Sequence, residues 1–265
     1  MSDKQRGNGE QNLALFIDFE NIALGVHEEK RKFDINLVLA RLLEKGNVVV
    51  KRAYSDWSRF REYKQQLHAA AVELIEVPQR RLGGKNSADI RMVVDVMDLS
   101  FNKPHIDAFV IASGDVDFSA LVSKLRENDK YVIGLGVKKA TSDMLVANCD
   151  EFIFYEDLVR EQEKQADTKQ KLPTRLAKLP QKKIEAFELF LAAIRGLVRE
   201  NKDVIWGSMI KQTMKRLNPS FDESYHGYSS FSKMLEDAEK HRLVKLRKDE
   251  KSGGYIVEAV ADDLV

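Results

Sequence analysis

The sequence contains very little cysteine, because Cys149 is the single one among 265 residues. One thiol cannot form an intrachain disulfide, and it cannot supply the several thiolates of a structural zinc site. The five histidines are scattered along the chain, and none has a partner at the HxxxH spacing of metal ligands. The single cysteine therefore excludes an intrachain disulfide framework and a thiolate zinc cluster. The histidine spacing does not indicate a metal site.

Long hydrophobic runs are also missing. No apolar segment approaches the roughly 20 residues that a membrane-spanning helix needs. The first twelve residues, MSDKQRGNGEQN, are polar and lack the apolar core of a signal peptide. We therefore expect a soluble, cytoplasmic protein with no membrane association.

Net charge is small, at +1, but it is unevenly distributed. Residues 1–163 contain 23 basic and 27 acidic side chains, whereas residues 164–253 contain 20 basic and 12 acidic ones. Such a division suggests a charged site joined to a segment that binds a polyanion, although ordinary solvated surface would look the same.

The first 158 residues alternate short apolar runs with helical patterns. This alternation predicts an α/β fold with a doubly wound, mostly parallel, Rossmann-like sheet. The predicted strands are 13–17, 47–54, 72–77, 106–112, 131–135 and 151–155. The predicted helices are 35–43, 56–71, 88–101, 117–128 and 141–147. The helix at 88–101 has Ile90, Val93, Val94 and Met97 on one face.

The rest of the chain predicts a second, smaller domain. Residues 159–183 are rich in Lys, Gln, Glu and Pro, which indicates a linker. Residues 184–258 contain three helical patterns followed by two short apolar runs around a charged turn. Three helices and a hairpin form a winged helix-turn-helix domain. The predicted organisation is therefore a domain at 12–158, a linker at 159–183 and a winged helix at 184–258.

The motif with most chemical content is Ile106–Phe118, IDAFVIASGDVDF. It begins as a buried strand and turns through Ser113 and Gly114 into Asp115 and Asp117. Open α/β sheets bind their ligands at this end of the strands. Two neighbouring carboxylates repel each other unless a cation or proton lies between them, and a divalent ion with oxygen ligands is the simplest partner.

Two further acids are expected at the same edge of the sheet. Asp18 follows the first strand, which adjoins the fourth at the switch point, and Asp89 opens the helix after a basic loop. Asp95 lies six positions later, about 240° around that helix, so it faces elsewhere and is expected to orient a partner or pair with a basic residue. The predicted ligands of a Mg²⁺ or Mn²⁺ ion are Asp18, Asp89, Asp115 and Asp117. Such an ion activates water and stabilises charge on a phosphodiester.

Each acid has a simpler interpretation. Asp18 could merely end a strand, and Asp115 or Asp117 could be the N-cap of the next helix. Asn21 and Ser113 could orient water or phosphate oxygens, or could be ordinary turn residues.

Several separated segments resemble the NYN domain, a family of the PIN-like ribonucleases. They are LFIDFENI, KNSADIRMVVDVMDL, FVIASGDVDFSALVSKLRENDKYVIGLG and TSDMLVANCDEFIFYEDL, in that order within about residues 12–158. The resemblance implies a metal-dependent ribonuclease of PIN-like fold, with acids at Asp18, Asp89, Asp115 and Asp117 and with Asn21 beside them.

Residues 184–258 resemble the OST-HTH, or LOTUS, domain, a winged helix found attached to NYN domains. The matching segments are VIWGSMIKQTMKRLNPSFDESYHGYSSFSKMLEDAEKHRLVKL and GGYIV. The resemblance implies RNA binding in many members and protein binding in some.

Basic and aromatic residues complete the expected RNA surface, because cations neutralise phosphates and exposed aromatic rings stack on bases. Trp206, Tyr228, Phe231 and Leu235 could instead be the core of the small domain. The candidate RNA-binding residues are Arg80, Arg81, Lys85, Lys138, Lys139, Lys211, Lys215, Tyr225, His226 and Lys248.

Three functions remain open from the sequence. The first is a Mg²⁺- or Mn²⁺-dependent endoribonuclease whose winged helix captures RNA. The second is an RNA-binding adaptor that has no catalytic activity. In the third, the C-terminal domain recruits a protein partner.

Overall fold

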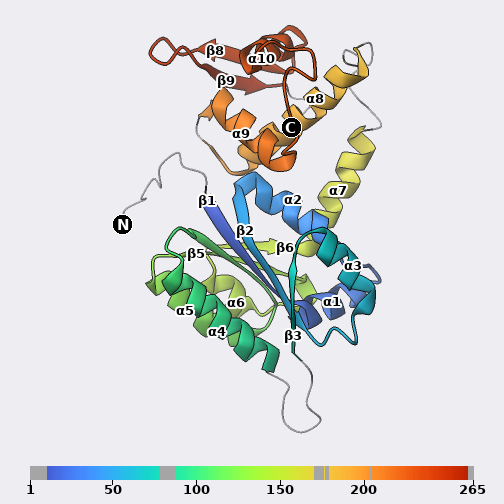
Figure 1. The fold of residues 1–265 in the computed structure, drawn as a ribbon, viewed down its shortest axis with the longest axis vertical. Helices are drawn as coiled ribbons and strands as arrows, with labels where there is room; N and C mark the ends of the chain where they lie inside the picture. The colour runs from blue at the N-terminus through green and yellow to red at the C-terminus, as the bar shows by residue number, and fades with distance from the viewer. Residues whose placement is uncertain (1–10, 78–86, 170–175, 177–178, 203, 262–265) are drawn as a thin grey trace. The chain divides into compact units, whose positions relative to one another are not determined.

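The structure is a computed structural model that describes residues 11–77, 87–169, 176, 179–202 and 204–261, without the side chains of 165–169. The chain divides into two compact units. The first comprises the chain to Leu42 and Asn47–Gln162, and the second comprises Leu43–Gly46 and the chain from Glu163 onward. Figure 1 shows a parallel sheet between helices in the first unit and a mainly helical second unit.

A six-stranded sheet forms the centre of the first unit, in the order β3-β2-β1-β4-β5-β6. The pairs β2–β3, β1–β4, β4–β5 and β5–β6 are parallel. The order changes direction between β1 and β4, which is the switch point of a doubly wound sheet. The strands are β1 (Gln11–Asp18), β2 (Gly46–Ser55), β3 (Glu73–Glu76), β4 (Ala108–Ala112), β5 (Tyr131–Gly136) and β6 (Glu151–Phe154).

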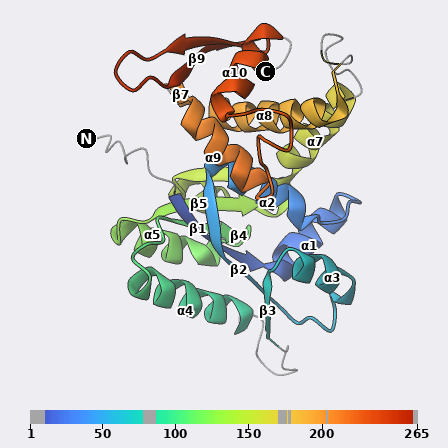
Figure 2. The same ribbon diagram turned by 45° about the horizontal axis from the view of Figure 1, so that its top comes forward.

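Helices cover both faces of this sheet (Figure 2). All five residues of β4 are buried, as expected for a central parallel strand with helices on both sides. One core lies beneath α1 (Phe19–Glu28), α2 (Ile35–Lys45), α3 (Arg61–Ala69) and the start of α7 (Tyr155–Lys169). The other lies beneath α4 (Ser87–Asn102), α5 (Ser119–Glu127) and α6 (Asp143–Asn148). The predicted α/β fold is therefore confirmed.

The structure differs from the prediction for two helices of this unit. Helix α1 was not predicted, because it begins directly after β1 without a loop. The predicted helix at 56–71 begins only at Arg61, because the Asp56 carboxylate accepts hydrogen bonds from the backbone and hydroxyl of Ser58 and forms a turn.

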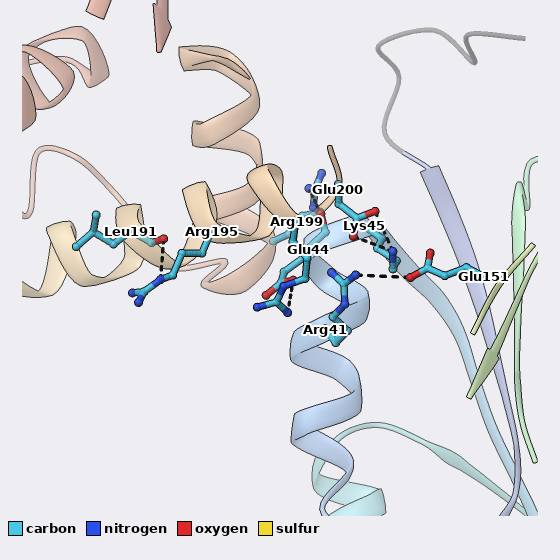
Figure 3. Close-up of polar contacts among 9 residues, drawn as sticks. Arg41, Glu44, Lys45, Glu151, Leu191, Arg195, Arg199 and Glu200 are labelled. Atoms are coloured by element: carbon cyan, nitrogen blue, oxygen red, sulfur yellow. Dashed lines mark hydrogen bonds and ion pairs between the residues drawn. The ribbon is translucent and has the colours of Figure 1, made fainter. Parts of the chain in front are cut away.

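Charged side chains make polar contacts within each unit (Figure 3). In the first, Arg41 of α2 lies 3.6 Å from Glu151 at the start of β6, which joins a helix to the edge strand. In the second, the Arg195 side chain donates to the Leu191 carbonyl one turn earlier. Burial lowers the pKa of Arg195, as does the neighbouring Arg199.

The second unit has the predicted winged-helix elements. Its sheet is antiparallel in the order β7-β9-β8, with a bulge between Lys245 and Leu246. Tyr228, Phe231 and Leu235 are buried core residues, which agrees with the core interpretation of these side chains, whereas Trp206 is only half-buried. The elements are α8 (Gln181–Arg199), β7 (Ile205–Trp206), α9 (Gly207–Leu217), α10 (Phe231–Lys240), β8 (Val244–Lys248) and β9 (Tyr255–Val260).

The hydropathy of the helices bears on whether one of them could span a membrane. Among the helices that the structure describes, none is both long enough and apolar enough to cross a membrane.

Candidate functional site

Two predicted acids lie where β1 and β4 end, at the switch point of the sheet. Asp18 is the last residue of β1 and the N-cap of α1, and it is only 7% exposed. Asp115 follows β4 after a short loop and is the N-cap of a single 3₁₀ turn, Val116–Phe118. Because β1 and β4 pair in parallel, with Ile17 opposite Ala112, their carboxyl ends meet at one edge.

Ser113 connects these two acids. Its hydroxyl donates to Asp18 Oδ2 at 2.9 Å and accepts the backbone N–H of Asp115 at 3.2 Å. The Asp115 carboxylate in turn accepts the N–H of Asp117 at 3.0 Å. Ser113 is fully buried, so these bonds are shielded from water and fix the loop after β4 relative to the end of β1.

Asn21 makes the second connection between the two loops. Its side-chain oxygen accepts the Gly114 N–H at 2.8 Å, and its own N–H donates to Asp18 Oδ1 at 3.4 Å. Gly114 is required at its position, because a Cβ there would collide with the Ala140 backbone. Asn21 and Ser113 therefore hold the two loops together and position the acids.

Asp18 and Asp115 are N-caps, a role that the simpler interpretation proposed for Asp115. Both accept backbone N–H bonds at the start of a helical turn. A carboxylate has about four lone-pair sites, so one or two accepted hydrogen bonds leave capacity for a cation. Capping thus orients these side chains without excluding a second role.

Electrostatics shows that the acids lie within reach of one another. Burial raises the pKa of Asp18 to about 7, with further contributions from Asp89 and Asp115. The pKa of Asp89 is also raised, first by burial and then by Asp115, Asp117 and Glu20. A cluster of carboxylates that raise one another's pKa is short of positive charge.

Glu20 was missed as a member of this acidic cluster. It acts on Asp89 through space and forms an ion pair with Arg59, which follows β2. Its position two residues beyond Asp18, in the first turn of α1, was the available signal. This position points to the acidic cluster only if α1 is known to begin directly at the end of β1.

The cluster has the chemistry of a hard-cation site but not a closed geometry. All of its charged donors are carboxylate oxygens, which Mg²⁺ and Mn²⁺ prefer. However, in the described part of the chain, no three acidic, His or Cys side chains are grouped so that they could hold a metal ion. The acids are therefore near neighbours whose carboxylates do not surround a single cation position in this structure.

Asp95 is turned away from this cluster, as predicted. It accepts a hydrogen bond from the Tyr54 hydroxyl at 2.9 Å and pairs with Arg91 at 3.1 Å and Arg52 at 3.8 Å. The expected pairing with basic residues is therefore correct, and Asp95 fixes α4 to β2.

The basic residues predicted near the acids have different outcomes. Arg80, Arg81 and Lys85 lie outside the described residues. Lys138 and Lys139 follow β5 in a 3₁₀ turn, at the same edge of the sheet as the acids. Lys138 pairs with Asp157 at 2.9 Å and Lys139 with Glu29 at 2.6 Å, so acidic neighbours partly offset their charge.

Cations of the second unit lie on α9 and the hairpin. Lys211 pairs with Glu223 at 2.6 Å and lies over the Phe231 ring, whereas Lys215 is exposed in the last turn of α9. Lys248 is exposed at the end of β8. Elsewhere on the hairpin, Lys245 and Arg247 both pair with Glu258.

The predicted aromatic pair lies in the loop between α9 and α10. Tyr225 is 59% exposed, and the Lys182 ammonium lies 4.1 Å from the centre of its ring. His226 stacks on Phe221, and its Nδ1 lies 2.6 Å from the Lys182 carbonyl. Tyr225 therefore has an aromatic surface with a cation attached, and Lys182 is a basic residue that the sequence did not single out.

Comparison with known proteins gives matches to two family models and to individual proteins and structures. The NYN domain model matches residues 12–156 and the OST-HTH/LOTUS domain model matches residues 186–255. An uncharacterized protein of Methanocaldococcus jannaschii is 30% identical over 144 residues, which are 53% of this chain and 54% of that protein. The chain thus spans about half the length of this curated relative. A crystal structure of a protein of unknown function from Vibrio parahaemolyticus superposes with a TM-score of 0.51 at 25% identity, covering 58% of this chain and 98% of that one.

Proposed function

Given that the chain belongs to the NYN domain family, we propose that it is an endoribonuclease that depends on Mg²⁺ or Mn²⁺ and hydrolyses RNA phosphodiester bonds. The NYN family consists of PIN-like nucleases, which generally use divalent metals, and OST-HTH/LOTUS domains bind RNA. The observation that carries the proposal is Asp18 at the switch point of the sheet, whose pKa is raised first by burial and then by Asp89 and Asp115.

The residues have distinct roles in this proposal. Asp18, Asp89, Asp115 and Asp117 would hold the cation, which when bound supplies an activated water and charge stabilisation at phosphate. Glu20 adds negative charge on the same side. The hydroxyl of Ser113 and the amide of Asn21 hold the two loops together, so that Asp18 and Asp115 keep fixed positions.

RNA would be held by cations around the acids and on the second unit. In the first unit we assign this role to Lys138 and Lys139, and also to Arg80, Arg81 and Lys85, which are outside the described residues. In the second we assign it to Lys211, Lys215, Lys248, Tyr225 and His226. A binding domain linked to a catalytic one raises the local substrate concentration without new contacts at the catalytic centre.

The decisive experiment is cleavage of labelled single-stranded and structured RNAs in Mn²⁺ or Mg²⁺ by the native chain and by Asp115→Asn. The native chain should cleave internally and stop when the ion is chelated, whereas Asp115→Asn should be slower by at least about a hundredfold. Asp143→Asn, in the first turn of α6, is the matched control. Equal cleavage by the native chain and Asp115→Asn would assign the activity to a contaminant.

A second candidate function is a non-catalytic RNA-binding adaptor. It is favoured by the capping bonds of Asp18 and Asp115 and by the open arrangement of the acids among the described residues. It predicts salt-dependent RNA binding without turnover in any divalent ion. Calorimetric titration of Mn²⁺ separates the two, because only the nuclease should release heat that Asp18→Asn abolishes.

A third candidate is that the second unit recruits a protein. The ion pairs of Lys211 with Glu223, and of Lys245 and Arg247 with Glu258, favour it because they reduce the positive charge available for phosphates. If it holds, reversing the charge of Lys211, Lys215 and Lys248 leaves RNA affinity unchanged. If the second unit binds RNA, the same variants weaken binding and reduce its dependence on salt.

A further inference from the structure

Helix α4 has two apolar faces, of which one is buried in its own unit and the other is largely exposed, apart from Met97, which also packs against the core. Met92, Val96 and Leu99 pack in the core beneath the helix. At roughly 100° per residue the opposite face carries a second apolar stripe. The stripe consists of Ile90, Val94, Met97 and Phe101.

Exposure of this stripe is high for large apolar side chains. Ile90 is 64% exposed, Val94 57% and Phe101 65%, while Met97 is half-buried. Of the helical face that the sequence suggested, Ile90 and Val94 point to solvent, whereas Val93 and Met97 are partly buried and pack against the core. Figure 2 shows α4 along the outside of the first unit. Scattered apolar residues are normal on a surface, whereas a continuous stripe marks an interaction site.

The spacing of the stripe is symmetrical about its midpoint. Its members are separated by four, three and four residues, so the pattern reads the same in both directions. A two-fold axis near positions 95 and 96 would place Ile90 opposite Phe101 of a second copy and Val94 opposite Met97. Two-fold interfaces require this property, because the same patch must match itself.

Charges beside the stripe are complementary under the same symmetry. Arg91 and Asp98 lie on one flank of the stripe, at about 100° and 80° around the helix from Ile90. An antiparallel second copy would bring Asp98 of that copy to within about 3 Å of Arg91 along the helix axis, at 1.5 Å per residue. The contact occurs twice by symmetry, whereas the two Arg91 side chains stay about 13 Å apart along the axis.

We propose that the protein forms a homodimer in which the α4 helices of two copies pack antiparallel through this stripe. A second copy explains both the self-matching spacing and the pairing of opposite charges on the flank. Asp89 precedes the stripe, so the two acidic clusters would lie near opposite ends of the helix pair. The dimer would present two separate sites.

Existing contacts on α4 are compatible with this arrangement. Arg91 pairs with Asp95 one turn later, and its side chain is 59% exposed. Asp98 accepts a hydrogen bond from Asn102 at 2.6 Å and is exposed. Both partners lie on the same helix, so the charged ends can contact a second copy while keeping them. One helix pair buries a small area, so the dimer should dissociate on dilution.

Sedimentation velocity of the full chain over a wide range of concentration tests the proposal. The native chain should pass from monomer to dimer as concentration rises. Val94→Lys should remain monomeric, because its charge would lie against the apolar stripe of the partner. Leu24→Lys, at an exposed apolar position of α1, is the matched control and should dimerise normally.

Charge reversal tests the register. Arg91→Asp and Asp98→Arg, each alone, replace two attractive contacts with two repulsive ones and should weaken the dimer by about tenfold or more. Mixing the two single variants should restore association, because both contacts are then attractive again. Circular dichroism verifies that each variant is folded.

Two outcomes would overturn the proposal. A native chain that stays monomeric at all concentrations means that α4 meets a different molecule or none. A dimer that persists in Val94→Lys, or two charge variants that fail to associate when mixed, means that another surface or register forms the contact.

Discussion

The substitution Asp18→Asn should stabilise the metal-free protein at pH 8 while it removes metal binding. Asp18 is buried at the end of β1, and burial together with Asp89 and Asp115 raises its pKa to about 7. Its ionised form is therefore unfavourable in the folded state. An asparagine has nearly the same shape and no charge.

The sign and size of the effect follow from proton linkage. Because the folded pKa is raised above the ordinary value of 3.8, the folded protein retains a proton between about pH 4 and pH 7 that the unfolded chain has released. Stability should therefore fall as pH rises through this window. A rise of about three pH units in the pKa corresponds to roughly 4 kcal/mol above pH 7. The amide cannot replace both accepted hydrogen bonds, which costs about 1–2 kcal/mol, so a net gain of about 2 kcal/mol is expected.

Thermal unfolding in chelator, from pH 4 to pH 8, measures this gain. The first unit of Asp18→Asn should melt roughly 5 °C higher than the native chain at pH 8 and show no gain at pH 4. Asp107→Asn is a matched control, since Asp107 accepts a backbone N–H at the opposite end of the same pair of strands. Adding Mn²⁺ should raise the melting temperature of the native chain only. If Asp18→Asn is no more stable at pH 8, the carboxylate is not an uncompensated buried charge.

Three further substitutions test the supporting residues. Gly114→Ala should destabilise the first unit by about 2 kcal/mol or more in chemical denaturation and abolish cleavage, because its Cβ would displace the Ala140 backbone; an unchanged stability would contradict the close approach. Glu20→Gln should lower the pKa of Asp89, which a carbon-detected NMR titration follows; an unchanged value would show that Glu20 does not act on that side chain. Tyr225→Ala should weaken RNA binding by about tenfold, whereas Tyr225→Phe should not, if the ring stacks on a base; equal affinities of the native and alanine forms would remove it from the RNA surface.

The topology was predictable because its signals are local and repeated. Buried parallel strands are continuous apolar runs, and β4 is such a run with all five residues buried. The acidic loop after it is equally visible in sequence, since Asp115 and Asp117 follow the strand after only Ser113 and Gly114. Their approach to Asp18 followed from the rule that ligands gather at the switch point, and the β1–β4 pairing bears that neighbour relation out.

Other features depended on tertiary structure and could not be read locally. Helix α1 begins within one residue of β1, so its first turn resembled a polar loop and the place of Glu20 was hidden. The stripe through Ile90 and Val94 has ideal helical spacing, but spacing alone cannot say which of two apolar faces of α4 meets the sheet. That choice is made by Met92 and Val96, which fit the core beneath the helix.

The capping bonds of the acidic cluster bear on the proposed cation binding. The hydrogen bonds that Asp18 and Asp115 accept hold their carboxylates at the strand ends, where Asp115 raises the pKa of both Asp18 and Asp89. Helix capping does not require acidic neighbours or burial. An exposed aspartate caps a helix equally well and avoids the free-energy cost of a buried charge. The cluster therefore carries an electrostatic cost that capping does not explain and that a divalent cation would offset. For this reason the stability of Asp18→Asn, measured with and without the ion, bears directly on whether the cluster is a catalytic centre or only a pair of helix starts.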